Sequence, residues 1–389
     1  MAFARTCAVA LAGVEGVLVE VQADLEPGVA AFTLVGLADK SLSESRDRVR
    51  AAVVNSGTPW PQRKLTVGLS PAAVPKHGSG FDLAVACSVL AAAERIDPRS
   101  IADLVMIGEL GLDGRVRPVR GVLPAVLTAA EAGCRQVVVP EQAAAEAALV
   151  PEVAVLGVRS LRQLIAVLAG EPVPEEPAEG EPGGHRTGPG PGWGQAPRAG
   201  LLPSCGGEQP CDLAEVSGQR LARRALEVAA AGRHHLFLTG PPGAGKTMLA
   251  ERLPGLLPPL SRQEALEVTA VHSLSGSLPA GRPLIDRPPY CAPHHSTSMA
   301  ALIGGGSGMP RPGAVSLAHH GVLFLDEARD TDLLRDQGTP ETRPRAAAAA
   351  RWPRAALAAR KPFARTPQPR RGSRPPRART RAATGTPSP

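Results

Sequence analysis

The eight residues GPPGAGKT, Gly240 to Thr247, restrict the fold of this chain more than any other stretch. They match the pattern G-x-x-x-x-G-K-[ST] in full, between an apolar stretch at 236–239, predicted to be a short buried strand, and the helical pattern KTMLAERL. In such a strand–loop–helix unit, glycines let successive backbone N–H groups turn towards an anion, and the helix directs its positive end at the same point. A chance glycine-rich turn would not require the flanking strand and helix, so we predict a nucleotide-binding loop.

The loop residues have separate predicted roles. Those expected to bind the nucleotide are Gly240, Pro241, Pro242, Gly243, Ala244, Gly245, Lys246 and Thr247. The Lys246 ammonium is predicted to reach the β- and γ-phosphates, which makes it a catalytic residue as well, and the Thr247 hydroxyl to ligate Mg²⁺. The cofactors that this pattern implies are ATP and Mg²⁺.

A second apolar stretch, GVLFLDE at 321–327, ends in two acids. Four large apolar side chains in its first five residues are typical of a strand buried in a parallel sheet. Asp326 is predicted to hold Mg²⁺ through water, and Glu327 to polarise the attacking water for hydrolysis of the γ-phosphate. Such a run is weak evidence alone, but it follows a complete phosphate loop by about 80 residues. We therefore expect the two segments to lie on neighbouring parallel strands.

The chain divides into ordered and compositionally biased parts. Residues 1–170 alternate predicted strands, such as KLTVGLSP at 64–71, with predicted helices, such as the apolar FDLAVACSVLAAAE at 81–94. Residues 171–211 contain nine Pro and ten Gly, a composition typical of a linker. Residues 212–327 begin with a predicted helix and carry both nucleotide-binding segments. The ordered parts are therefore expected to be α/β.

The N-terminus, MAFARTCAVALAGVEGVLVEV, contains a short apolar run that Glu15 interrupts, and no clear cleavage site follows. A strand is predicted here in place of a signal peptide. Further along, Asp113–Gly114 is predicted to turn between two strands. No stretch approaches the ~20 apolar residues needed to span a bilayer. We expect a soluble, cytoplasmic protein without membrane partners.

Four further stretches extend the pattern beyond these motifs: FTLVGLADKSLSESRDRVRAAVVNSG, KHGSGFDLAVACSVL, APHHSTSMAALIGGG and GAVSLAHHGVLFLDE. With them, about 1–170 and 212–327 resemble the magnesium-chelatase-like AAA+ ATPases of the YifB/ComM type. The resemblance implies a first domain with the Lon-protease-like form of the ribosomal-S5-domain-2 fold, and a second that is a P-loop AAA+ core built on a parallel sheet. It also implies a homo-hexameric, ATP-dependent ring that acts on DNA and promotes branch migration.

Lon-type proteolysis is not expected of the first domain. The family pattern K-D-G-P-S-A-G lies over KHGSGFD at 76–82, where Gly80 takes the place of the nucleophilic serine and Ser79 stands one position early. The lysine of the second motif falls at Leu123. A scaffold or a partner-binding module is the expectation for this domain.

Residues 328–389 differ in composition from the rest. They hold 15 Arg/Lys against 4 Asp/Glu, ten Pro and five large apolar residues. Such a segment cannot bury enough area to offset ordering costs of about 1–2 kcal/mol per residue, so a disordered tail is predicted. The polar sensor, arginine finger and helical lid that the resemblance implies are not recognisable here. This predicts a truncated or frameshifted chain with an incomplete AAA+ core and impaired hydrolysis; a basic arm for nucleic acid and an evolved truncation are the alternatives.

The leading functional prediction is an ATP-binding AAA+ ATPase of the YifB/ComM type that processes DNA. The alternative is a non-catalytic binding module, or a pseudogene product, with an unfolded ATPase remnant. A chelatase subunit for tetrapyrroles shares the ATPase motif, but such subunits resemble only the second half of this chain.

Cysteine and histidine residues are not predicted to form a metal site. Cys205 and Cys211 lie without a second ligand pair at zinc spacing, and the other four cysteines are isolated and expected to be reduced core residues. Histidines occur in the adjacent pairs 234–235, 294–295 and 319–320. Because neighbouring side chains of a strand point to opposite faces, structural roles are favoured over metal binding.

Overall fold

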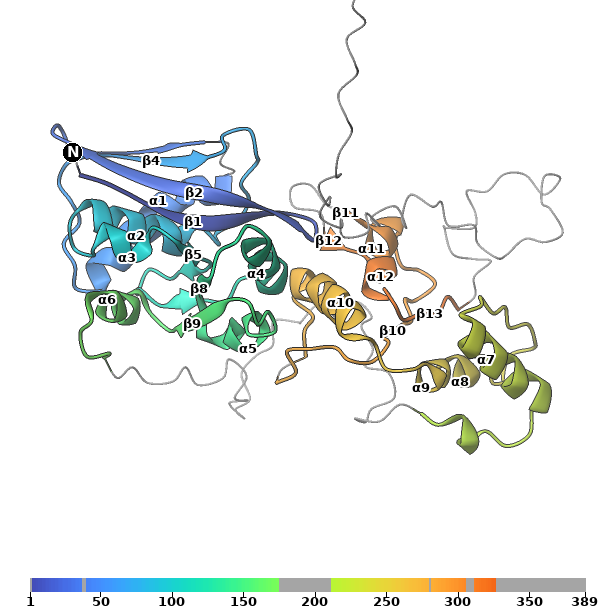
Figure 1. The fold of residues 1–389 in the computed structure, drawn as a ribbon. Helices are drawn as coiled ribbons and strands as arrows, with labels where there is room; N and C mark the ends of the chain where they lie inside the picture. The colour runs from blue at the N-terminus through green and yellow to red at the C-terminus, as the bar shows by residue number, and fades with distance from the viewer. Residues whose placement is uncertain (1, 37–39, 175–210, 280, 306–310, 327–389) are drawn as a thin grey trace, which may run out of the picture. The chain divides into compact units, whose positions relative to one another are not determined.

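The computed structural model describes residues 2–36, 40–174, 211–279, 281–305 and 311–326 (Figure 1). Most of the predicted linker, the whole predicted tail at 328–389 and the predicted catalytic acid Glu327 lie outside the described residues. Within them the fold is α/β, as the sequence predicts.

A seven-stranded mixed sheet organises the first part of the chain, with strand order β3-β4-β2-β1-β5-β8-β9. Its strands are β1 (Ala2–Ala12), β2 (Glu15–Glu26), β3 (Ala31–Val35), β4 (Lys64–Ser70), β5 (Leu104–Met106), β8 (Gln136–Pro140) and β9 (Ala154–Val158). The pairs β1–β2 and β2–β4 are antiparallel, and the other four pairs are parallel. The predicted strand at the N-terminus is confirmed as β1. Strand β9 was not predicted, because its five residues AVLGV are too few to show a clear alternation of apolar and polar side chains.

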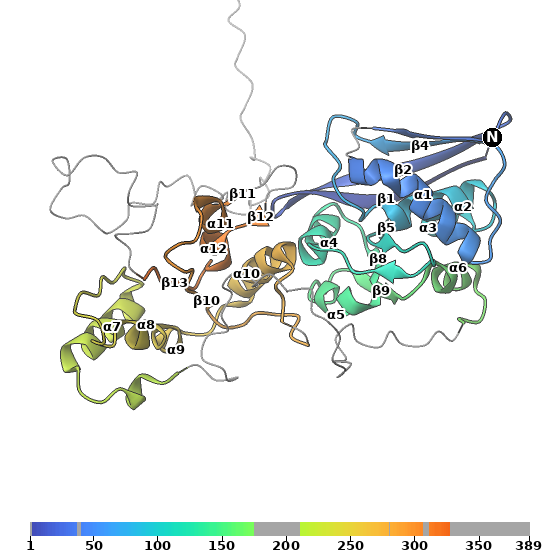
Figure 2. The same ribbon diagram turned by 180° about the vertical axis from the view of Figure 1, so that it is seen from behind.

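Helices cover both faces of this sheet (Figures 1 and 2). They are α1 (Lys40–Asn55), α2 (Asp82–Ala92), α3 (Pro98–Ile101), α4 (Val122–Glu131), α5 (Ala144–Ala147) and α6 (Leu161–Ala169). Side chains of β1 alternate between two hydrophobic clusters: Ala4 and Ala8 pack with α1, α2 and α6, whereas Val9 and Leu11 pack with α4 and α5. The period of two along a strand therefore divides the core into two layers.

A short hairpin connects this sheet to α4. Strands β6 (Glu109–Leu110) and β7 (Val116–Arg117) pair antiparallel, with Leu110 opposite Val116. Gly114 lies in the left-handed region between them, at φ 84°. The predicted Asp113–Gly114 turn is thus confirmed, because only a residue without a β-carbon adopts this angle freely.

Helix α2 is buried along its whole length, from Asp82 to Ala92. The carboxylate of Asp82 is held by Arg48 of α1, whose Nε and Nη2 atoms donate over 2.8 and 3.1 Å. The backbone N–H of Leu110 also donates to it, over 3.3 Å. Burial raises the pKa of the Asp82 carboxyl, while the bonds to Arg48 lower it. The arginine therefore compensates a charge that the surrounding apolar layer disfavours.

Replacing Arg48 by methionine tests this interaction. The change keeps the aliphatic stem but leaves Asp82 buried without its charged partner, which costs about 3–5 kcal/mol. We expect hydrogen exchange of the α2 amides to accelerate accordingly. Arg46→Met is the matched control, because the ion pair that Arg46 makes among the described residues is with the exposed Asp47, over 3.3 Å, and its loss should change stability by about 0.5 kcal/mol or less. Equal exchange rates in both variants would contradict the assigned role of Arg48.

The second part of the chain contains shorter elements. The helices are η2 (Leu213–Glu215), α7 (Arg220–Gly232), α8 (Lys246–Ala250), α9 (Leu253–Leu256), α10 (Arg262–Ser275), α11 (Met299–Ile303) and α12 (Ala314–Leu317). The strands are β10 (Tyr290–Cys291), β11 (Gly304–Gly305), β12 (Arg311–Pro312) and β13 (Val322–Leu323). Helix α10 starts with a capping box, in which Ser261 and Glu264 bond each other's backbone N–H groups.

Two strand predictions in this part need correction. Residues 236–239, predicted as a buried strand before the phosphate loop, form no strand, and the side chain of Phe237 is 60% exposed. The predicted strand at 321–325 is reduced to Val322–Leu323, which pairs in parallel with β10, and it is half-buried. A strand in a sheet interior needs a hydrogen-bonded neighbour on each side. Among the described residues β13 has one such neighbour and 236–239 have none.

Candidate nucleotide-binding site

The glycine-rich loop has the backbone shape that its sequence predicts. Gly243 and Gly245 both adopt φ 79°, in the left-handed region. The N–H of Ala244 donates to the carbonyl of Pro241 over 3.2 Å, which closes a tight turn. Gly245 then caps α8, and its carbonyl accepts from Leu249 over 3.0 Å. The change from turn to helix therefore occurs within the predicted motif.

Lys246 folds back over this loop. Its Nζ atom donates to the carbonyl oxygens of Gly240 and Pro241, over 3.0 and 3.1 Å. An ammonium group has three N–H donors, so one remains for a further partner. The structure thus brings the predicted phosphate-binding lysine together with the start of the loop. Thr247 lies in the first turn of α8 and is exposed.

A residue that the sequence analysis missed also holds the loop. Gln219, at the start of α7, donates from Nε2 to the carbonyl oxygen of Ala244 over 3.0 Å. Its own φ is 44°, which turns the chain into α7. In the sequence, Gln219 is marked only by its place beside Gly218, just before a helical pattern. Such a pair occurs at no fixed distance from a phosphate loop, so it does not predict a contact with the loop.

Helices α7 and α8 share a small hydrophobic core. Leu226 of α7 and Leu249 of α8 are buried together with Leu213 and Val216. Arg252, which follows α8, adds polar contacts: Nη2 lies 2.9 Å from a Glu215 carboxylate oxygen, and Nε donates to the Asp212 carbonyl over 3.1 Å. The residues before α7 and those after the loop are therefore one packed unit.

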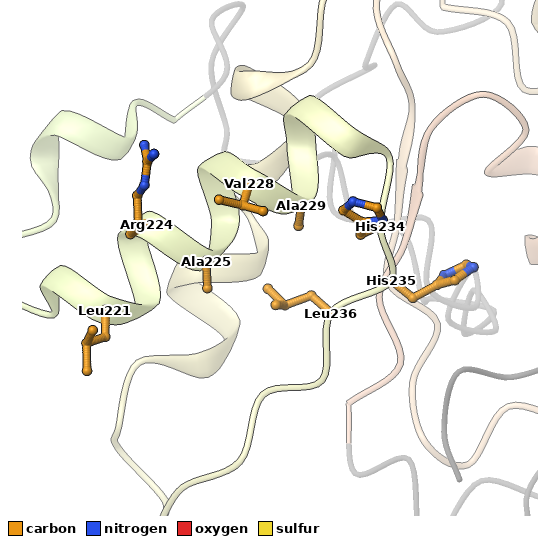
Figure 3. Close-up of a pocket in the computed structure, with 8 residues that line it drawn as sticks. All are labelled: Leu221, Arg224, Ala225, Val228, Ala229, His234, His235 and Leu236. Carbon is orange, nitrogen blue, oxygen red and sulfur yellow. The ribbon is translucent and has the colours of Figure 1, made fainter. Parts of the chain in front are cut away.

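The opposite side of α7 leaves an apolar pocket open, with a volume of about 430 Å³ (Figure 3). Its lining residues are Leu221, Arg224, Ala225, Val228, Ala229, His234, His235 and Leu236. The sequence predicts a helix packed through positions 221, 225, 226, 228 and 229. Of these, Leu226 and Ala229 are buried, whereas the Leu221 side chain is 89% exposed. Leu236, the first residue of the strandless segment 236–239, is one of the residues that line this pocket.

The acidic end of β13 is described only in part. Asp326 is exposed, three residues beyond Leu323, and Glu327 lies outside the described residues. Burial raises the pKa of the Tyr290 hydroxyl on β10, and the charges of Glu251 and Asp326 raise it further. Glu251, at the end of α8, and Asp326 therefore both raise the pKa of the same tyrosine. Convergence of the loop with both acids stays a prediction.

Comparison with known proteins identifies the family. Residues 212–334 match the family model for magnesium chelatase subunit ChlI, and residues 21–143 match a model described as subunit ChlI of Mg-chelatase. The expectation that chelatase subunits resemble only the second half of the chain is therefore wrong. Competence protein ComM of Haemophilus influenzae is 40% identical over 318 residues, which are 81% of this chain and 58% of ComM. The chain belongs to the magnesium-chelatase-like YifB/ComM family. Escherichia coli YifB is 38% identical over 329 residues, which are 83% of this chain and 60% of YifB.

The similarity extends to a mycobacterial protein and, over a shorter stretch, to a protease. An uncharacterized protein of Mycobacterium tuberculosis is 54% identical over 333 residues, which are 86% of this YifB/ComM chain and 62% of that protein. The chain thus spans about three fifths of the length of these relatives. Lon protease of Brucella suis is 28% identical over 146 residues, or 36% of this chain and 18% of the protease. The predicted Lon-like character therefore has partial support.

The residues at the Lon-type positions contact other groups. Ser79 donates to the Glu109 carboxylate, and the buried Lys76 donates from Nζ to the Pro71 carbonyl. Leu123, at the position of the second-motif lysine, is fully buried. Burial lowers the pKa of the Lys76 ammonium, which is the direction expected for a cation in an apolar layer.

The cysteines agree in part with the prediction of reduced core residues. Cys7, Cys87, Cys134 and Cys291 are free thiols; Cys87 and Cys291 are buried, and the other two are half-buried. Cys211, which that prediction did not include, is disulfide-bonded. None of the helices in the described ranges is both long and apolar enough to cross a membrane.

The loop shape can be tested at Gly243. A β-carbon there would meet no atom within 4 Å, so Gly243→Ala adds only backbone strain. That strain is about 1–2 kcal/mol. We expect the Leu249 amide, which closes the first turn of α8, to exchange its hydrogen faster by roughly fivefold to thirtyfold. Gly243→Asn is the control, because asparagine adopts the left-handed region more readily and should restore part of the protection. Unchanged exchange in the alanine variant would refute the proposed constraint.

Proposed function

We propose that this YifB/ComM-family chain is an AAA+ ATPase whose residues 240–247 bind ATP with Mg²⁺. The observation that carries the proposal is the conformation of the loop: two left-handed glycines, followed by a lysine whose ammonium lies over the loop. The match of 212–334 to the magnesium chelatase model supports it independently.

The residues present fit a triphosphate. Open space at Gly243 lets an anion approach the backbone, since no neighbouring atom occupies the position of a β-carbon. Lys246 is held by two carbonyl oxygens, which a phosphate oxygen can replace as a stronger, charged acceptor. The Thr247 hydroxyl is exposed and available as a ligand of Mg²⁺.

In this proposal, the acidic residues Asp326 and Glu327 promote hydrolysis of ATP. Asp326 would hold Mg²⁺ through water, and Glu327 would take a proton from the attacking water. Bound Mg²⁺ would supply charge compensation for the phosphate oxygens. The pairing of β13 with β10 supports a defined position for Asp326, because it anchors the strand that the acid follows.

The cellular role that we propose is DNA processing by an ATP-dependent homo-hexamer, as the family resemblance implies. Support comes from the similarity to the competence protein ComM over 81% of this chain. The partner in this proposal is DNA.

A Lys246→Ala variant tests nucleotide binding. The change removes the cation that would bond the β- and γ-phosphates, and a charge-assisted hydrogen bond contributes about 1.5–3 kcal/mol. We expect the affinity for ATP with Mg²⁺, measured by calorimetry on the full chain, to fall at least about tenfold. Lys64→Ala is the matched control: Lys64 is an exposed lysine of β4 that pairs with Glu26 over 2.7 Å, and its loss should leave ATP affinity unchanged. Equal affinities of the wild type and Lys246→Ala would remove the proposal.

Limited proteolysis distinguishes this function from the alternative of a non-catalytic module. Arg233 is exposed and precedes the strandless segment 234–240, so trypsin should cut there in the absence of nucleotide. Binding at the adjacent loop should order the segment and slow the cleavage at least several-fold when ATP and Mg²⁺ are added. The protection should be absent in Lys246→Ala. Identical cleavage of the wild-type chain with and without nucleotide would favour the non-catalytic alternative.

A further inference from the structure

Two adjacent histidines meet a glutamate of another element beside the acidic strand. Glu267 lies on α10, and His319 and His320 lie between α12 and β13. The Nε2 atoms of His319 and His320 are 3.4 and 2.8 Å from the same Glu267 oxygen, Oε2. One potential ligand atom from each of the three residues falls within 4.8 Å of the others. This grouping is formed by the tertiary structure, since 52 residues separate Glu267 from His319.

The expectation that adjacent histidines point to opposite faces is wrong at this site, because the pair does not belong to a strand. His319 follows the end of α12, and His320 has a left-handed backbone with φ 54°. The left-handed residue turns its side chain towards the same side as its neighbour, so the ring centroids are 4.1 Å apart. A positive φ at a non-glycine residue is uncommon and persists where the surrounding structure imposes it.

Helix α12 is fixed against α10, which sets the position of both histidines. His272 of α10 donates from Nε2 to the Leu317 carbonyl over 3.0 Å. Leu317 and Ala318 are buried in a cluster with Cys291 of β10. Glu267, His319 and His320 therefore lie on or next to elements that pack together through other contacts. This packing brings the three side chains close to one another.

We propose that Glu267, His319 and His320 bind a divalent transition-metal ion, with Zn²⁺ as the best match. Two imidazoles and a carboxylate are a ligand set that zinc accepts, and three protein ligands leave a fourth position for water. With bonds of about 2.0–2.1 Å, tetrahedral geometry places ligand atoms roughly 3.3–3.4 Å apart, close to the separation of His319 Nε2 and Glu267 Oε2.

The surroundings agree with such a site. The side chains of His319 and Glu267 are 48% and 43% exposed, so an ion and its water have access from solvent, whereas His320 is only 14% exposed. A Glu264 oxygen lies 3.7 Å from Nδ1 of His320. Metal-binding histidines are typically oriented by a carboxylate or carbonyl at their second ring nitrogen. Glu264 is the carboxylate nearest to that nitrogen of His320, at a distance longer than a direct hydrogen bond.

The ion would join α10 to the residues immediately before β13. Gly321 and Val322 follow His320 directly, and β13 leads to Asp326. A metal bond across this junction would hold the strand that carries the predicted Mg²⁺-binding acid. The proposal does not require nucleotide, and its test is independent of ATP binding.

The test is titration of Zn²⁺ and Co²⁺ into the full chain without nucleotide. We expect one equivalent of Zn²⁺ to bind by calorimetry, and Co²⁺ to give visible absorption of a tetrahedral nitrogen–oxygen site without thiolate bands. Glu267→Gln and His320→Asn should each weaken the metal affinity at least about tenfold. Asparagine is chosen because it tolerates the left-handed backbone of residue 320, and thermal unfolding without metal checks that both variants fold.

The chain offers a matched control in a second histidine pair. His294 and His295 have ring centroids 4.0 Å apart, and His294 bonds the Ser296 hydroxyl instead of a carboxylate. The double variant His294→Ala/His295→Ala should bind Zn²⁺ like the wild type, and Zn²⁺ should raise the unfolding temperature of both. Absence of Zn²⁺ binding to the wild type would overturn the proposal. Unchanged Zn²⁺ affinity in the folded Glu267→Gln and His320→Asn variants would also overturn it. Loss of Zn²⁺ binding in the His294→Ala/His295→Ala control would do the same.

Discussion

The positive φ angles of Gly243 and Gly245 are the constraint on which the candidate site depends. They turn the chain so that α8 starts at Lys246, whose side chain returns over Gly240 and Pro241. Any residue with a β-carbon would be strained at these angles. The loop therefore keeps its shape through local backbone geometry, and the small core shared by α7 and α8 supports it from one side.

Sheet formation behaves differently, because a strand depends on its neighbours. In the first part of the chain seven strands pair with one another, and two helical layers bury the alternating side chains of β1. In the second part the runs at 236–239 and 321–325 are both mostly apolar. The first forms no strand, and only two residues of the second, Val322 and Leu323, form one. Apolar composition selects residues that suit a buried strand, but only paired backbone groups make one.

The histidines illustrate a related limit of sequence patterns. Alternation of side chains was the right rule for a strand, but His320 adopts a left-handed conformation between a helix and a strand. That angle brings both imidazoles to one carboxylate from a helix distant in the sequence. Gln219 is a similar case, since its bond to the Ala244 carbonyl follows from the packing of α7 against the loop.

The sequence by itself determined the turn-to-helix conformation of the glycine-rich loop, the strands at the N-terminus and at 64–70, the helix Asp82–Ala92, the Asp113–Gly114 turn and the membership of the YifB/ComM family. These features depend on glycine angles, on local periodicity and on motifs within short stretches, which the order of residues specifies directly. Tertiary structure alone decided the strand order of the sheet, the burial of Asp82 against Arg48, the contact of Gln219 with the loop and the meeting of Glu267 with two histidines. Each of these joins residues that are distant along the chain, so the packing of whole elements sets their distances.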